Sequence, residues 1–281
     1  MTKGKRRITQ KEREALGKIV AHLEEYRTRL EQHDAELSQS NYFRIMGELR
    51  SYIAVAGDEN LYELFHRGKG SRLYAAFFRS QNDYYMRAME TQQAMELFSS
   101  ESDTPMGDHI FSQVHTRDHY IQKAESFRLA DLSTVRQVVS VGCGPMPETV
   151  LWVRDNTSIP DIIGIDNAHE AIHLCRRLVN QLCLNRVHFQ HVDARDYNYK
   201  SADLVFVANF VAAKTGILDR IAQTGNSRTQ ILVEVPTGLQ RLVYSDFVLH
   251  RFLTVEQEAM TDSRHCRQKT QKIVWFDPYQ D

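Results

Sequence analysis

The residues best suited to chemistry form a glycine turn and an acid that follows one strand later. Residues 138–141 are the apolar run Val-Val-Ser-Val, and Gly142 and Gly144 follow it on either side of Cys143. Glycines let the backbone approach a ligand closely, and an open parallel sheet binds its ligand beyond the carboxyl ends of its strands. Asp166 ends the next apolar run, where a carboxylate can accept hydrogen bonds from both hydroxyls of a ribose. These residues predict a cofactor that contains a nucleoside.

Two classes of cofactor carry such a ribose, and the segment after the glycines separates them. The third glycine of the dinucleotide fingerprint, which allows close packing beside a pyrophosphate, is replaced by a segment with Pro145 and Pro147. S-adenosylmethionine has no pyrophosphate. Asp193 follows the third apolar run, where enzymes that use this cofactor bind the adenine amino group, although a cap on the strand end explains Asp193 alone equally well. The order of glycine turn and two acids therefore favours S-adenosylmethionine over a nicotinamide.

Composition limits the other function classes. The 281 residues carry a formal net charge of -1, and their only basic cluster, residues 1–7, is expected to be a solvated terminus and not a nucleic-acid arm or signal peptide. No apolar run approaches the ~20 residues that cross a bilayer, so we expect a cytoplasmic protein without a membrane partner. The four cysteines have no Cys-x-x-Cys spacing, and we expect no metal site.

The first part of the chain has the pattern of helices. None of the 6 prolines precedes Pro105, so this region lacks the residue that most reliably ends a helix. Thr9 and Glu12 form a capping-box pattern, and apolar residues then recur every three or four positions up to Leu30. Further helices are predicted at about 40–56, 60–65, 74–99 and 109–130. Residues 1–135 are therefore predicted to be an all-helical N-terminal domain.

From residue 136 the pattern changes to short β-branched runs that alternate with helical segments. The predicted strands are 138–141, 161–165, 187–192, 203–208, 230–235 and 272–276, and the helices are 146–155, 168–183, 214–224 and 238–249. Strands that alternate with helices indicate a parallel sheet with helices on both faces. Residues 136–281 are thus predicted to be an α/β, Rossmann-like domain of the class I S-adenosylmethionine-dependent transferases.

Residues 142–149, Gly-Cys-Gly-Pro-Met-Pro-Glu-Thr, resemble the Gly-Ser-Gly-Pro-apolar-Pro-x-Thr signature of the nicotianamine synthases. The similarity is sharper to their bacterial relatives, the histidine 2-aminobutanoyltransferases of staphylopine- and pseudopaline-type opine metallophore biosynthesis. It continues through residues 163–166, 175–180 and 208–214. The total length and a helical N-terminal domain of similar size agree with the resemblance.

The resemblance implies transfer of the 2-aminobutanoyl group of S-adenosylmethionine to an amino-acid amine, with histidine as the expected acceptor and 5'-methylthioadenosine as the by-product. An opine dehydrogenase is then the expected pathway partner, and a homodimer is one option for the assembly. Two other enzymatic readings stay open: methyl transfer to a small molecule, and cyclisation of the cofactor to azetidine-2-carboxylate. A helical interaction module on a degenerate Rossmann domain is disfavoured because the glycine turn and both acids are present.

The resemblance also suggests roles for residues outside the cofactor turn. An attacking ammonium must lose a proton, and the family carries an essential glutamate upstream of the turn, a role that Glu125 would take. The interpretation that Glu125 is only a solvated surface residue is nearly as good. Tyr120 on the same predicted helix is a second candidate for the base, and the alternative for Tyr120 is a place in the core. Glu148 could act on the substrate or simply stabilise its helix N-terminus, and the relatives usually have an apolar or aromatic residue there.

The remaining expected contacts lie at strand ends. Glu234, at the end of the fifth apolar run, could hold the acceptor's ammonium or imidazole. Asn209 follows the fourth run, where it could contact cofactor and substrate or only form a turn. The complete predicted cofactor set is Gly142, Cys143, Gly144, Pro145, Asp166, Asn167, Asp193, Ala194 and Asn209.

Overall fold

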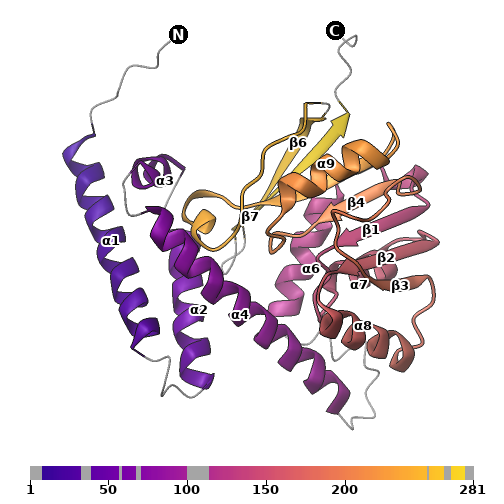
Figure 1. Cartoon of the computed structure of the whole chain (residues 1–281), viewed down its shortest axis with the longest axis horizontal. Helices are drawn as coiled ribbons and strands as arrows, with labels where there is room; N and C mark the ends of the chain where they lie inside the picture. Colours follow the sequence, from indigo (N-terminus) through magenta and orange to yellow (C-terminus); the bar gives the residue numbers. More distant parts are fainter. Residues whose placement is uncertain are drawn as a thin grey trace. The chain divides into compact units, whose positions relative to one another are not determined.

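The computed structural model describes residues 8–32, 39–56, 59–67, 71–99, 114–251, 253–262 and 267–275 (Figure 1). By compactness the chain divides into two units. The first is made of Met1–Tyr85 and Thr237–Val243, and the second of Met86–Pro236 and Tyr244–Asp281. This division differs from the domain boundary predicted at 135/136, which marks where the strands begin. Among the described residues we find no helix whose length and apolar character would let it traverse a bilayer.

The first unit is helical, as the sequence predicts. It contains α1 (Gln10–Glu31), α2 (Gln39–Val55), α3 (Glu59–His66), the first part of α4 (Ser71–Ser99) and the 3-10 helix η2 (Gly238–Leu242). The predicted capping box is present, because Glu12 N donates to Thr9 Oγ1 at 3.2 Å and Thr9 N donates to Glu12 Oε2 at 2.8 Å. Apolar residues at helical spacing form its core, among them Leu23, Met46 and Leu49.

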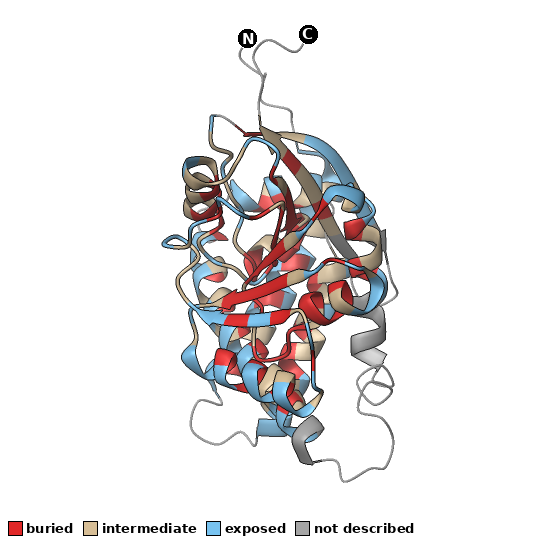
Figure 2. Ribbon diagram, turned by 90° about the vertical axis from the view of Figure 1, so that its right-hand side faces the viewer, coloured by how far each residue is buried: buried red, intermediate tan, exposed pale blue. Residues whose placement is uncertain are grey.

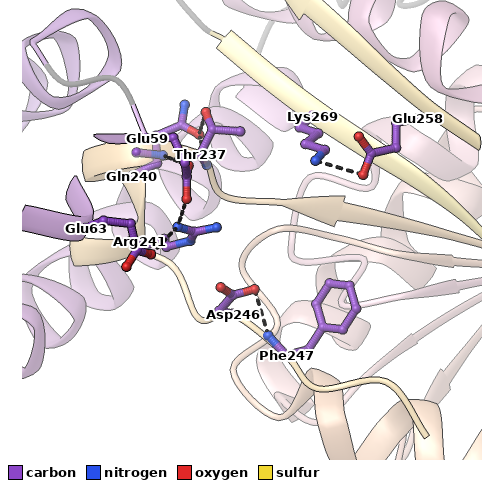
Figure 3. A network of polar contacts seen from close by, with 10 residues as sticks. Glu59, Glu63, Thr237, Gln240, Arg241, Asp246, Phe247, Glu258 and Lys269 are labelled. Carbon is purple, nitrogen blue, oxygen red and sulfur yellow. Dashed lines mark hydrogen bonds and ion pairs between the residues drawn. The ribbon is translucent and has the colours of Figure 1, made fainter. Parts of the chain in front are cut away.

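The predicted helix at 238–249 is wrong beyond Leu242, where the chain becomes irregular. The reason is tertiary, because this segment is bonded to other helices of the first unit. The Arg241 carbonyl accepts from Arg79 at 2.8 Å, and Glu59 accepts from Gly238 N at 3.1 Å. Glu59 also pairs with the Arg241 guanidinium (Figure 3). The bond to the Arg241 carbonyl takes the place of one that a continuing helix would make, and the Glu59 bond satisfies the backbone N–H at the start of the segment.

The second unit is built on a seven-stranded sheet in the order β3-β2-β1-β4-β5-β7-β6. The strands are β1 (Gln137–Val141), β2 (Asp161–Asp166), β3 (Val187–His191), β4 (Leu204–Val207), β5 (Gln230–Val235), β6 (Leu253–Asp262) and β7 (Arg267–Trp275). The first five in chain order are parallel, and β7 is antiparallel to both β5 and β6. The predicted strands are confirmed up to β5, whereas the sequence prediction omitted β6 and shortened β7.

Side chains that alternate along the strands divide the core between the two faces of the sheet. Phe206 and its neighbours pack with α6 (Val114–Phe127), α7 (Glu148–Asn156) and α8 (His169–Gln181), and Val205 and its neighbours pack with α9 (Lys214–Thr224). Figure 2 shows buried residues along the strands of the sheet. The strand β6 lies at the edge and exposes Glu256 and Glu258, so it lacks the apolar pattern by which β1 to β5 were predicted.

Candidate functional site

The glycine turn lies at the carboxyl end of β1, and its conformation requires glycine. Gly142 has φ 72° and Gly144 has φ 62°, both in the left-handed region that side chains disfavour. Space is short as well, because a Cβ at Gly142 would overlap the Val211 side chain and one at Gly144 would overlap the Glu90 carboxylate. The turn is held against β2 by Gly142 N, which donates to Ile165 O at 2.9 Å.

Asp166 ends β2 beside this turn, as the sequence predicts. Its Oδ2 accepts from Gly144 N at 3.0 Å, and its Oδ1 accepts from Ala168 N at 2.8 Å. A carboxylate oxygen has two lone pairs, so each oxygen can accept one further hydrogen bond, as a ribose diol would supply. Asn167, the next residue, is exposed, and its carbonyl lies 3.0 Å from His191 Nε2.

Cys143 and Pro145 of the predicted cofactor set are buried in the turn. The Cys175 thiol of α8 donates to Gly144 O at 3.0 Å. Contact with Cys175 and burial raise the pKa of the Cys143 thiol well above its usual range. A thiol that stays protonated is a poor nucleophile, so Cys143 is suited to packing and its backbone is the part that can serve a ligand.

Asp193 has the arrangement of a turn cap. Its carboxylate pairs with the Arg195 guanidinium at 2.6 Å and accepts from Arg195 N at 2.9 Å. These bonds to Arg195 lower the pKa of Asp193 to about 2. The neighbouring Ala194 carbonyl accepts from the Tyr199 hydroxyl at 2.9 Å. The capping role is therefore realised, and adenine binding by Asp193 stays a prediction.

Glu234 and Asn209 form one buried network at the ends of β5 and β4. Glu234 pairs with the ammonium of Lys123 on α6, and its Oε2 accepts from Asn209 N at 2.9 Å. Lys214 Nζ donates to the Asn209 carbonyl at 3.0 Å and to Asn209 Oδ1 at 3.1 Å. The sequence predicts that Glu234 holds an acceptor's ammonium, and in the structure the ammonium at its carboxylate is that of Lys123.

The predicted catalytic residues lie on two helices, α6 and α7. Glu125 on α6 pairs with Arg128 at 2.6 Å, and its side chain is 38% exposed. Tyr120 lies in α6, but its side chain is outside the described part of the structure. Glu148 is half-buried as the first residue of α7, the position where an acid favours a helix N-terminus.

Glu90 of α4 is the functional candidate that the sequence analysis missed. Its carboxylate lies against Gly144, which belongs to the same compact unit. Met86 and Ala94, one helical turn before and after it, are buried, so Glu90 lies on the buried stripe of its helix. The signal in the sequence was an acidic residue on the otherwise apolar face of a predicted helix. It was not used, because the segment was interpreted only as a helix that packs in the core.

The described side chains include no group of three or more His, Cys, Asp and Glu residues that could hold a metal ion.

Comparisons with known proteins place this architecture among solved structures. No family model matches the sequence, and neither does any curated protein. A glutamate-to-glutamine variant of the nicotianamine synthase MtNAS aligns with TM-score 0.77 and 15% identity over 93% of this chain and 97% of that one. The chain has the fold of MtNAS. The predicted fold class, a Rossmann-like domain preceded by helices, is thereby confirmed.

Two further MtNAS structures align equally well. The variant in complex with S-adenosylmethionine gives TM-score 0.75 at 16% identity, over 90% of this chain and 96% of that one. MtNAS in complex with MTA and tNA gives 0.77 at 14% identity, over 94% and 98%. At this identity the likeness establishes the fold, and the helical region is included in it.

Proposed function

We propose that the protein binds S-adenosylmethionine and transfers its 2-aminobutanoyl (3-amino-3-carboxypropyl) group to an amino-acid amine, releasing 5'-methylthioadenosine. The observation that carries this proposal is the alignment with MtNAS over 93% of the chain, which extends beyond the Rossmann-like unit to the helices. MtNAS has been crystallised with S-adenosylmethionine and with MTA, the donor and the by-product of such a transfer. The signature at 142–149 supports the same reaction.

The cofactor would bind at the carboxyl ends of β1 and β2. Gly142 and Gly144 hold the turn in the left-handed conformation that it needs, and Asp166 is held with lone pairs available for the ribose hydroxyls. Asn167 and Asp193, at the ends of β2 and β3, would lie further along the same edge of the sheet. A nucleoside with a short amino-acid chain fits such an edge, where ligands of open α/β sheets bind.

The reaction would be a displacement at carbon. The acceptor amine attacks the Cγ of the methionine moiety, the bond between Cγ and sulfur breaks, and its electron pair leaves with 5'-methylthioadenosine. Three carbons are bonded to the sulfur, and the one that reacts is the one aligned with the amine. Bringing two reactants together speeds a reaction only when the reacting atoms are correctly oriented. The product retains the amino and carboxyl groups of the transferred unit.

The attacking amine must be neutral, so a base has to accept its proton. Glu90 is better supported for this role than Glu125. Glu90 places its carboxylate against Gly144 of the glycine turn, whereas the Glu125 carboxylate lies at Arg128, three residues along its own segment. A carboxylate at the turn is within the region where the amino-acid end of the cofactor would lie.

Histidine is the acceptor that the resemblance favours, and a product for opine metallophore biosynthesis follows from it. An opine dehydrogenase would then condense the product's amine with a 2-oxo acid. These finer assignments rest on residues 142–149 and 208–214 of the sequence.

The test is to incubate the protein with S-adenosylmethionine and L- or D-histidine and to identify both products by mass spectrometry. We expect 5'-methylthioadenosine and a histidine derivative heavier by one aminobutanoyl unit. S-adenosylhomocysteine as the main nucleoside would show a methyltransferase instead. Release of 5'-methylthioadenosine without any acceptor would indicate cyclisation.

A further inference from the structure

Lys123 and Glu234 form an ion pair inside the second unit that does not touch the glycine turn. Lys123 is 8% exposed and Glu234 is 4% exposed, and Lys123 Nζ also lies 4.7 Å from the centroid of the Phe206 ring. Buried ion pairs are often no more stabilising than well-packed apolar residues of similar volume. Stability alone is therefore a weak explanation for this pair.

Hydrogen bonds link this ion pair to the turn that follows β4. The strands β4 and β5 are neighbours with Val207 beside Val233, so the residues after them lie close together. Glu234 uses one oxygen for Lys123 and the other for Asn209 N at 2.9 Å. Lys214 holds the Asn209 carbonyl and Oδ1, so Asn209 is fixed through backbone and side chain.

The 208–211 turn packs against the glycine turn. Ala208 N donates to Val141 O at 3.2 Å, and Val211 N donates to Ala208 O at 3.3 Å. The Val211 side chain lies so close to Gly142 that a Cβ there would overlap it. A displacement of residues 208–211 would therefore change the position of Gly142.

We propose that Lys123 and Glu234 are positioning residues that hold the 208–211 turn against Gly142 and so maintain the cofactor site. The effect on S-adenosylmethionine rests on the proposed function. Glu234 acts through the hydrogen bond that it accepts from Asn209 N, and Lys123 orients the Glu234 carboxylate and offsets its buried charge.

Two double variants separate the hydrogen bond from the charge. Lys123→Met/Glu234→Gln removes both charges but keeps an oxygen to accept from Asn209 N, and Lys123→Met/Glu234→Leu removes that oxygen too. Neither leaves an unpaired buried charge, the usual cause of misfolding in such variants. We expect calorimetry to give the Gln variant an affinity for S-adenosylmethionine within about threefold of wild type. The Leu variant should bind about tenfold more weakly, the equivalent of one lost hydrogen bond.

Ser126→Ala is the matched control. Ser126 lies on the same helix, one turn after Lys123, and its hydroxyl is 2.7 Å from that of Thr270, the register partner of Glu234. It makes a comparable polar contact to the sheet without reaching Asn209. We expect this variant to lower the melting temperature while leaving the affinity for S-adenosylmethionine unchanged.

Three outcomes would count against the proposal. Wild-type affinity for S-adenosylmethionine in the Leu double variant would overturn it. So would a loss of affinity that parallels the loss of melting temperature in all three variants, Ser126→Ala included. Wild-type protein that binds no S-adenosylmethionine would overturn the proposed function and this inference with it. That last result is seen before any variant is compared, so the two failures are distinguishable.

Discussion

Gly144 N donates a hydrogen bond to Asp166 Oδ2 at 3.0 Å, which joins the glycine turn after β1 to the acid at the end of β2. The same carboxylate accepts from Ala168 N at 2.8 Å. Asp166 thus shapes the turn, and under the proposed function it would also offer acceptors to a ribose.

Replacement of Asp166 should weaken binding of S-adenosylmethionine and 5'-methylthioadenosine alike, since both carry the ribose diol. For Asp166→Ala we expect a loss of ~1.5 to 3 kcal/mol in binding free energy for each, the cost of removing a hydrogen-bonded charged partner. Calorimetry with both nucleosides measures it. Asp161→Asn, at the opposite end of β2, is the control and should change neither affinity. Equal affinities in wild type and Asp166→Ala would refute the ribose assignment.

Gly142→Ala should destabilise the fold for two separable reasons. The left-handed φ of 72° costs a residue with a Cβ about 1 to 2 kcal/mol, and the new methyl group also overlaps Val211. In the double variant Gly142→Ala/Val211→Ala the overlap is relieved and the backbone strain remains. We therefore expect Gly142→Ala to lower the free energy of unfolding less in the Val211→Ala background than in the wild-type background. Denaturant unfolding of the four proteins measures both differences. Equal losses in the two backgrounds would show that the Val211 contact is unimportant.

Glu90→Gln should reduce turnover by ~100-fold or more, within the range of general-base contributions, because the amide cannot accept the amine's proton. Its affinity for S-adenosylmethionine should stay near wild type, since size and most hydrogen bonding are kept. Rates of 5'-methylthioadenosine release give the first quantity and calorimetry the second. Glu125→Gln is the matched comparison and should retain turnover within a few fold. The reverse pattern would assign the base to Glu125, as the sequence resemblance suggests.

The ion pair between Asp193 and Arg195 predicts a small pH-dependent contribution to stability. The folded-state pKa of Asp193 is lowered to about 2, whereas an unfolded aspartate titrates near ~3.9. The contribution is therefore fully present above about pH 4 and is lost as the pH falls toward 2. Urea unfolding of wild type and Asp193→Asn should differ at pH 6, and the difference should shrink below pH 4. The pair is partly exposed, so the effect should be modest. A difference that does not change with pH would contradict this account.

Local patterns were enough to predict the core of the second unit. The strands β1, β2, β4 and β5 are apolar runs buried on both faces, and β3 alternates buried Val187 and Phe189 with exposed residues. Both patterns are visible in any single sequence. The glycines of the turn and Asp166 at a strand end follow from the same local reading. Parallel strands bring their carboxyl ends to one edge, so the meeting of Gly144 and Asp166 could be inferred before the structure was known.

Contacts between distant segments decided the rest. Glu90 reaches Gly144 only because the part of α4 from Met86 onward packs in the second unit, and Glu234 meets Lys123 across 111 positions of the chain. The segment at 238–249 has a helical pattern, but the helix ends at Leu242, and the Arg241 carbonyl, which a longer helix would use, accepts from Arg79 of α4 instead. Side-chain periodicity records which face of an element is buried and not which partner buries it. The sequence alone therefore determined the Rossmann-like framework and its glycine turn, while the tertiary structure decided that Glu90 lies against that turn and that Glu234 pairs with Lys123.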